Sequence, residues 1–429
     1  MSGLSARDSA RVLALGSLAL AHFLLTYWIN WLLAHHLEPV EFDDFNVALS
    51  VLSVLSTIAT LGLEKYALRC VPVYRERSDW GHLQGFYRFA VIATLAGSCV
   101  LVVGSALTML LIQVPGGHSF AFRQVLLYLP VIATALLAVE LATANGQQLP
   151  AATAYRLLQP LLFAVALGVL VHWDHGLTLV NILNGYGLAW SGCLVVLTWL
   201  IRRHTPGAAW TARPRYLAAK WVRRAAPLLM NSCMLSIMAS SGVIILELNH
   251  PALAEVGIYA VAAQTGTFIV LLTNTANRFY LPLVSLFLER HDVATMRRLL
   301  RHRLIIIGGL ALWLGMLLAW QGRNILGWFG PSFTEGYEAM LVIAAGASVN
   351  AMFSDSPYYL QFIKRSRDVF VTTAFAMVLN IVLTVALSHH LGMLGAAYGY
   401  SISMSLFFLV QRAQVSRHLR GTWRSRRRR

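Results

Sequence analysis

The sequence predicts an all-helical integral membrane protein with twelve transmembrane helices, arranged as two six-helix bundles related by a pseudo-two-fold axis along the membrane normal. Three observations predict this fold class. Of 429 residues, 57% are hydrophobic and 12% are charged, against roughly 25% charged residues in an average soluble domain. Long apolar runs recur along the whole chain, and the chain resembles itself at a shift of about 213 residues. So few charges cannot cover the surface of a soluble protein of this size.

Each predicted span is an apolar run between charged or Pro/Gly-rich breaks. A hydrocarbon core of about 30 Å requires about 20 such residues per helix, because lipid offers no partner to an unpaired backbone amide. The first six spans lie near residues 11–33, 43–63, 89–112, 124–146, 153–173 and 178–201. The second six lie near residues 225–247, 254–281, 303–321, 337–362, 369–389 and 394–413.

The positive charge is distributed as in an inner-membrane protein. A net charge of +16 would suggest nucleic acid as the partner of a soluble protein, but with the N-terminus inside, 31 of the 34 Lys and Arg residues fall in cytoplasmic segments. This bias predicts a bacterial inner membrane location, both termini in the cytoplasm and no nucleic-acid partner. The first span is too long for a signal-peptide core and is expected to stay uncleaved. The basic tail is either a topology anchor or an attachment to anionic lipid or a partner protein.

An internal repeat predicts the two bundles. Residues 76–79 align with residues 289–292 at a shift of 213, and residues 41–45 align with residues 255–259 at a shift of 214. Six spans are an even number, so the repeat is parallel, and a central substrate cleft is expected between its halves. The predicted parts are an N-terminal bundle (1–201), a basic cytoplasmic linker (202–223), a C-terminal bundle (224–414) and a basic cytoplasmic tail (415–429). The four cysteines lie in or beside spans with no CxxC pair, so neither a disulfide nor a metal site is expected.

Short motifs in this order resemble one transporter family. Residues 37–42 (LEPVEF), leading into a polar helix that closes with residues 61–69 (LGLEKYALR), resemble the Wzx-type polysaccharide flippases of the multidrug/oligosaccharidyl-lipid/polysaccharide exporter superfamily. The second half adds similar segments at residues 255–259, 280–282, 329–333 and 392–397. The resemblance extends over about residues 37–413. Asp43 departs from it, because the family often has the glycine that stands at Gly257 here.

The resemblance implies a flippase rather than an enzyme. It implies that an undecaprenyl-diphosphate-linked oligosaccharide crosses to the periplasmic leaflet by alternating access, for synthesis of O-antigen, capsule or exopolysaccharide. The implied partners are the lipid-linked oligosaccharide, membrane lipids, a polysaccharide polymerase and glycosyltransferases. A sugar hydroxyl in hydrocarbon without a hydrogen-bond partner costs on the order of several kcal/mol, and a diphosphate costs far more. The cleft is therefore expected to be polar while the prenyl tail stays in lipid.

The predicted substrate-binding residues are polar and cationic side chains in or beside the spans. Arg278, near the inner end of the eighth span, is expected to bind the diphosphate through parallel hydrogen bonds. Lys65, Arg69 and Arg156 are expected to form a cationic inner mouth. Polar stripes at helical spacing add His22, Asn30, Asn46 and Asn274. The alternatives are helix packing for the polar residues and positive-inside retention for the cations.

Three acidic residues within apolar spans are candidates for ion coupling. Glu140, Glu247 and Asp355 lie where a charge costs roughly 2.5–3.5 kcal/mol on insertion scales. Glu140 and Asp355 stand 215 residues apart and so at matching depth in the two halves. They are predicted to couple transport to a proton or sodium gradient, with no other cofactor. The alternative is a structural ion pair or a protonated, hydrogen-bonded acid.

Rival functions share some of these features. A membrane glycosyltransferase would explain the acidic first outer loop, but not the internal repeat. A cation-coupled multidrug antiporter or a lipid II flippase belongs to the same superfamily, although a lipid II flippase usually has two additional helices. A porter of the major facilitator type is the last alternative.

Overall fold

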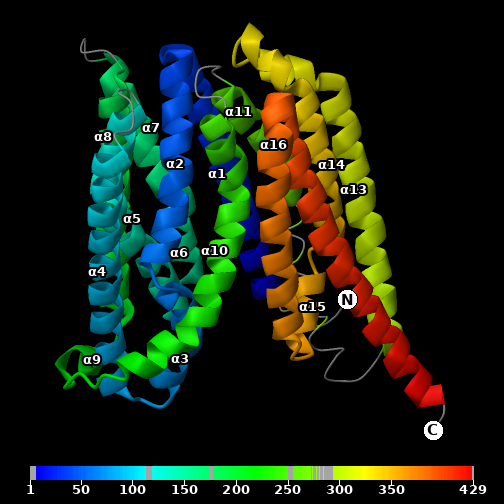
Figure 1. Cartoon of the computed structure of the whole chain (residues 1–429). Helices are drawn as coiled ribbons and strands as arrows, with labels where there is room; N and C mark the ends of the chain where they lie inside the picture. The colour runs from blue at the N-terminus through cyan, green and yellow to red at the C-terminus, as the bar shows by residue number, and fades with distance from the viewer. Residues whose placement is uncertain are drawn as a thin grey trace. The chain divides into compact units, whose positions relative to one another are not determined.

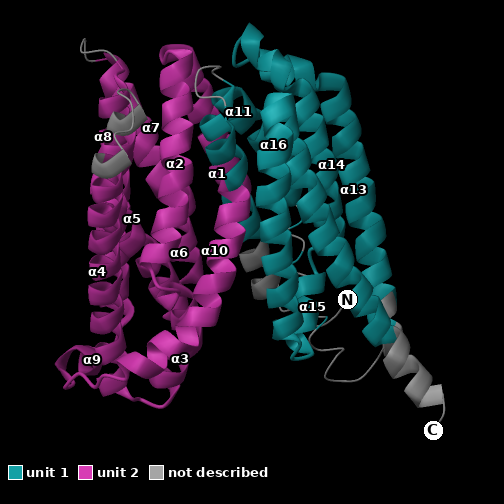
Figure 2. Ribbon diagram, viewed as in Figure 1, with its two compact units in different colours: residues 1–19, 241–429 teal, residues 20–240 magenta. Residues whose placement is uncertain are grey.

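A computed structural model describes residues 6–112, 118–172, 177–249, 255–271, 273, 277, 280, 284 and 293–427, with side chains described from residue 13 to residue 419 except at a few helix ends. The chain divides into two compact units (Figure 2). Unit 1 comprises residues 1–19 and 241–429, and unit 2 comprises residues 20–240. The helices α1 (Ala6–His36) and α10 (Ala218–Asn249) each contribute to both units.

All regular elements of the described residues are helices (Figure 1). Ten helices in this part of the chain are long and apolar enough to cross a membrane. One of the ten, Ser366–Leu419, is 54 residues long and contains a break at Gly392, and a shorter apolar helix covers Val256–Leu271. These findings confirm an all-helical, multi-span membrane protein. The count of twelve spans and the pseudo-two-fold axis stay predictions.

Unit 2 packs its helices around α5. The elements between α1 and α10 are α2 (Pro39–Ala59), α3 (Leu63–Glu76), α4 (Trp80–Ile112), α5 (His118–Ala144), α6 (Gln148–Thr153), the π-helix η1 (Ala154–Leu158), α7 (Gln159–His172), α8 (Leu179–His204) and α9 (Gly207–Thr211). Helix α5 contacts α2, α3, α4 and α8. Small residues allow this close approach. A Cβ atom at Gly187 of α8 would overlap the ring of Tyr128 of α5.

Unit 1 is built around α14. After α10 follow α11 (Val256–Gly266), α13 (Val293–Gly327), the 3₁₀ helix η2 (Pro331–Gly336), α14 (Tyr337–Phe353), α15 (Ser356–Phe362) and α16 (Ser366–Arg427). Helix α14 contacts α11, α13 and α16. The break in α16 is made by Gly392, which has a φ of 53°. The carboxylate of Glu255 accepts a hydrogen bond from the amide of Met393 at 3.2 Å and so satisfies a donor that the break releases.

Candidate functional site

Regular α-helix in unit 2 is interrupted at two places, and a third helix contains an internal proline. Between α2 and α3 the chain turns through Leu61 (φ 52°) and Gly62 (φ 70°), two left-handed residues. A Cβ atom at Gly62 would lie 2.7 Å from the backbone nitrogen of Leu229, so this turn needs glycine to sit against α10. Helix α10 contains Pro227, two residues before Leu229. The second interruption is the π-helix η1. π-Turns are frequent at functional sites, and broken helices are frequent at the binding sites of membrane transporters.

The turn at Gly62 places an ion pair at the beginning of α3. Nζ of Lys65 lies 2.6 Å from Oε1 of Glu140 on α5, with the two side chains 45% and 20% exposed. Burial alone would lower the pKa of Lys65, but Glu140, Glu64 and the Tyr155 hydroxyl outweigh burial and raise that pKa. Lys65 is therefore held protonated, with the carboxylate of Glu140 as its ion-pair partner.

Glu64 is the buried member of this cluster. It is only 6% exposed, and its Oε2 has no hydrogen-bond partner among the described residues. Burial raises the pKa of Glu64, and the charge of Glu140 adds to this rise against the opposing effects of Thr60 and Lys65. A carboxyl group in this position favours the protonated form, because an ionised one would lack partners.

Aromatic and basic groups from η1 extend the cluster. Nδ1 of His22 lies 3.1 Å from the backbone oxygen of Arg156, and the rings of His22 and Tyr155 lie 5.8 Å apart. Tyr155 also contacts Trp190 of α8, with ring centroids 5.8 Å apart. Within the described residues, the guanidinium of Arg156 has no carboxylate partner. We call Glu64, Lys65, Glu140, Tyr155 and Arg156 the unit 2 cluster.

Several predicted site residues fall outside this cluster. Arg69 is exposed one turn after Lys65 on the same face of α3. Asn46 donates to the carbonyl of Phe42 in its own helix at 2.8 Å, and Asn30 is partly buried on α1. Arg278 and Asn274 lie outside the described residues.

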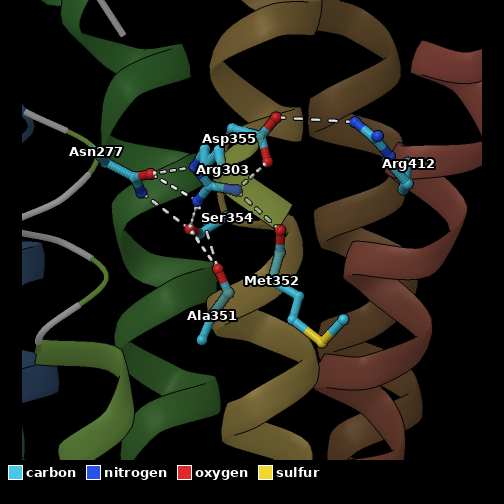
Figure 3. A network of polar contacts seen from close by, with 7 residues as sticks. All are labelled: Asn277, Arg303, Ala351, Met352, Ser354, Asp355 and Arg412. Atoms are coloured by element: carbon cyan, nitrogen blue, oxygen red, sulfur yellow. Dashed lines mark hydrogen bonds and ion pairs between the residues drawn. The ribbon is translucent and has the colours of Figure 1, made fainter. Parts of the chain in front are cut away.

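Unit 1 contains a second polar network, centred on Arg303 of α13 (Figure 3). Its Nη1 lies 2.8 Å from Oδ1 of Asp355 and donates to the carbonyl of Met352 at 2.8 Å. Its Nε and Nη2 donate to the Asn277 side-chain oxygen at 3.2 and 2.7 Å, and Nη2 also donates to Ser354 at 2.9 Å. Arg303 is only 1% exposed, so this guanidinium is fully occupied by the protein itself.

The network stabilises the break between α14 and α15. Helix α14 ends at Phe353, so the carbonyls of its last turn lack intrahelical donors, and Pro357, in the first turn of α15, has no amide hydrogen to offer the carbonyl of Phe353. Arg303 supplies such donors, and Asp355 balances its charge. Arg412 of α16 adds a longer contact to Asp355, 3.8 Å from Oδ2. This arrangement favours the structural ion-pair alternative for Asp355, while its role in ion coupling stays a prediction, as does that of the partly buried Glu247.

The residues of these networks that the sequence analysis missed include Arg303, Glu64 and Tyr155. Arg303 stands at the start of the ninth predicted span, where it counts only as cytoplasmic charge. Pro357, two residues after Asp355, is the sequence signal of a helix break at this point. Glu64 lies within the motif of residues 61–69 without a predicted role, although it is an acid directly beside a lysine at a span end. Tyr155 gave no signal in the sequence.

The family of the chain follows from its sequence. The profile of the family described as "Polysaccharide biosynthesis protein" matches residues 10–287. The chain belongs to this family. The match confirms the resemblance drawn from the sequence motifs, and no curated protein matches the sequence.

Two solved structures show the fold of this polysaccharide biosynthesis protein. An inward-facing multidrug resistance transporter of the MATE family and MOP superfamily superposes with a TM-score of 0.73 at 14% identity, covering 99% of this chain and 97% of that chain. The lipid II flippase MurJ in an inward closed conformation superposes with a TM-score of 0.72 at 14% identity, covering 94% of this chain and 87% of that chain. The chain therefore has the fold of these transporters, neither of which is an enzyme.

Proposed function

We propose that this protein is a flippase that moves a polyprenyl-diphosphate-linked oligosaccharide across the bacterial inner membrane for surface polysaccharide synthesis. The observation that carries the proposal is the unit 2 cluster: two cations, a buried acid and an ion-paired acid gathered beside the turn at Gly62 and the π-helix η1, in a chain of the polysaccharide biosynthesis family. Non-helical backbone in a membrane protein is tolerated where it is buried or lines a hydrated path. Twelve spans, a central cleft, cytoplasmic termini and alternating access complete the proposal.

In this proposal Arg156 is the unit 2 group that binds the diphosphate. It carries a permanent charge with no carboxylate partner in the described part of the chain, and a guanidinium binds phosphate oxygens bidentately. Lys65 would join it when its pair with Glu140 opens. Arg69 would lengthen the cationic mouth, and Arg278 would contribute from the eighth predicted span. His22, Asn30, Asn46 and Asn274 would bind sugar hydroxyls.

The same cluster supports a proposal for coupling to protons. Glu64 favours the protonated form, whereas Glu140 holds Lys65. Loss of the Glu64 proton would place a second carboxylate beside Lys65 and weaken its pair with Glu140. An anionic headgroup would then meet a cation whose position depends on the proton at Glu64.

Transport in proteoliposomes tests the function. The probe is a polyprenyl-diphosphate-linked oligosaccharide whose sugar becomes accessible to a membrane-impermeant lectin when it is flipped. Arg156→Ala should slow flipping about 10- to 100-fold, because a hydrogen bond to a charged group contributes about 1.5–3 kcal/mol. Arg88→Ala, which removes an exposed arginine of α4, is the matched control. No flipping by the wild-type protein, or equal rates in both variants, would refute the proposal.

A second experiment tests coupling. Flipping by the wild-type protein should depend on an imposed proton gradient, and Glu64→Gln should flatten that dependence, because glutamine fixes the neutral form. Asp355→Asn is compared for the predicted site in unit 1. Dependence on sodium alone would exclude Glu64 as the coupling residue while leaving the flippase function intact.

A further inference from the structure

The segment that joins α8 to α10 in unit 2, residues 199–224, is here called the elbow. It contains seven cations and no acidic residue. All seven are exposed: Arg202, Arg203, Arg213, Arg215, Lys220, Arg223 and Arg224. The positive-inside rule alone would account for these charges even if the connection had no fixed conformation. The elbow, however, is fixed to the protein.

The backbone of the elbow packs against two glycines of α4, Gly81 and Gly85. The amide of Arg215 donates to the carbonyl of Gly81 at 2.9 Å. A Cβ atom at Gly85 would overlap the carbonyl oxygen of Arg215, so the elbow chain lies directly on the helix surface. Nearby, Nε2 of Gln84 donates to the carbonyl of Trp210 at 2.9 Å. Backbone contacts of this kind hold the chain in place while leaving side chains outward.

The first turns of α10 are fixed in the same way. Trp221 is fully buried, with its ring 5.3 Å from that of Phe86, and it donates to the Tyr74 hydroxyl at 3.0 Å. Lys220, Arg223 and Arg224 flank the buried Trp221 and are all exposed. Arg223 lies nearly opposite Trp221, because successive residues are about 100° apart around a helix. The cations are therefore displayed by packing and not only by composition.

Exposed aromatic side chains alternate with these cations. Trp199, Trp210 and Tyr216 are 54%, 39% and 52% exposed, and the guanidinium of Arg203 lies 5.1 Å from the ring of Trp199. Exposed tryptophan and tyrosine beside basic residues are typical of the membrane–water interface. The elbow must lie at such an interface, because it connects the ends of two candidate membrane spans.

We propose that the elbow is a binding surface for anionic phospholipid headgroups of the adjoining leaflet. The negative charge of Asp79 interacts with Arg215 and so offsets part of the positive charge of the elbow. Within the described residues, no carboxylate lies within ion-pair distance of any of the seven cations. Their natural counter-charge is therefore the lipid phosphate, and the aromatic rings insert beside it. The inference is independent of the substrate that the protein transports.

Native mass spectrometry of the full-length protein in mixed micelles tests the inference with phosphatidylglycerol and phosphatidylcholine as probes. The wild-type protein should retain phosphatidylglycerol at least tenfold more tightly at low salt, and the difference should shrink in 0.5 M NaCl. A basic residue near an anionic surface contributes roughly fivefold in affinity. The triple variant Arg213→Gln, Lys220→Gln, Arg223→Gln should therefore lose most of the preference.

A variant that keeps all seven cations tests whether lipid binding depends on the fixed position of the elbow or on its charge alone. Gly85→Leu should displace the elbow and lower the phosphatidylglycerol preference about tenfold, whereas Gly104→Leu, at an open position of the same helix, should not. Folding of each variant is checked by size-exclusion chromatography and thermal unfolding. Wild-type preference in the triple variant, or in folded Gly85→Leu, would overturn the inference. So would equal retention of both lipids by the wild-type protein.

Discussion

The Arg303 network allows a quantitative prediction for Arg303→Met. Methionine keeps the length and apolar bulk of the side chain but leaves the Asp355 carboxylate and the Met352 carbonyl buried without their donors at 2.8 Å. The two charged side chains are only 2% and 5% exposed. Removing one partner of a buried pair costs about 3–5 kcal/mol. Arg412, at 3.8 Å, is too distant to replace the lost hydrogen bonds.

The double variant Arg303→Met, Asp355→Leu tests the origin of this loss. It removes both charges together, so the cost of a buried lone charge disappears, while the carbonyls near the end of α14 still lack donors at about 1–3 kcal/mol. The double variant should therefore be more stable than either single variant. A coupling free energy of at least about 2 kcal/mol between the two positions is expected.

Denaturant titration in mixed detergent micelles measures these differences. Arg365→Met is the control, because the Arg365–Asp368 pair is 3.6 Å long with side chains 52% and 40% exposed, and exposed pairs contribute about 0–1 kcal/mol. If Arg303→Met unfolds within about 1 kcal/mol of the wild-type protein, the network does not stabilise the helix break. Additive effects of the two single substitutions would also refute the reasoning.

Three further predictions concern unit 2. The wild-type protein should lose stability as pH rises from the ordinary pKa of 4.5 through the raised pKa of Glu64, because the folded state binds the Glu64 proton more tightly than the unfolded state does. Glu64→Gln should remove this pH dependence from the free energy of unfolding. An unchanged pH dependence in the variant would contradict the prediction. Gly62→Ala should cost about 2–4 kcal/mol, because a left-handed alanine must also displace the α10 backbone; a thermal shift near zero would contradict the required turn. Asn145→Leu should cost about 1–3 kcal/mol, because it leaves the buried Tyr87 hydroxyl without its partner at 2.9 Å; Tyr87→Phe combined with it should recover part of the loss.

The sequence predicted the class of fold well because lipid imposes a simple rule. Every span must be long, apolar and internally hydrogen-bonded, so composition and the breaks between runs locate the helices. The family resemblance rested on the order of short motifs and was confirmed over residues 10–287. The elbow shows the limit of this approach. Its charge was visible in residues 202–223, but its docking on Gly81 and Gly85 depends on a contact between segments more than 100 residues apart.

The unit 2 cluster shows why site residues were only partly predictable. Lys65 and Glu140 were both singled out, but for separate roles, because periodicity places residues on a face of one helix and does not say which helices meet. Their ion pair depends on the turn at Gly62, whose conformation is set by its contact with α10. Glu64 is buried by the same turn. Helix-level reasoning identified the residue types, and tertiary packing decided their partners.

Broken helices provide a way to separate structural cations from candidate binding cations. In unit 1, Arg303 donates to carbonyls near the end of α14. In unit 2, Arg75 donates to the carbonyl and side-chain oxygens of Asn145, directly after α5, at 2.6 and 3.0 Å. A helix that breaks inside a membrane protein exposes carbonyls that lipid cannot satisfy, and Arg303 and Arg75 are already occupied by the carbonyls at these two helix ends. Arg156 meets no such carbonyl among the described contacts. In the proposed function it is therefore the first cation of the unit 2 cluster to bind an anionic substrate, before the pair of Lys65 with Glu140 opens.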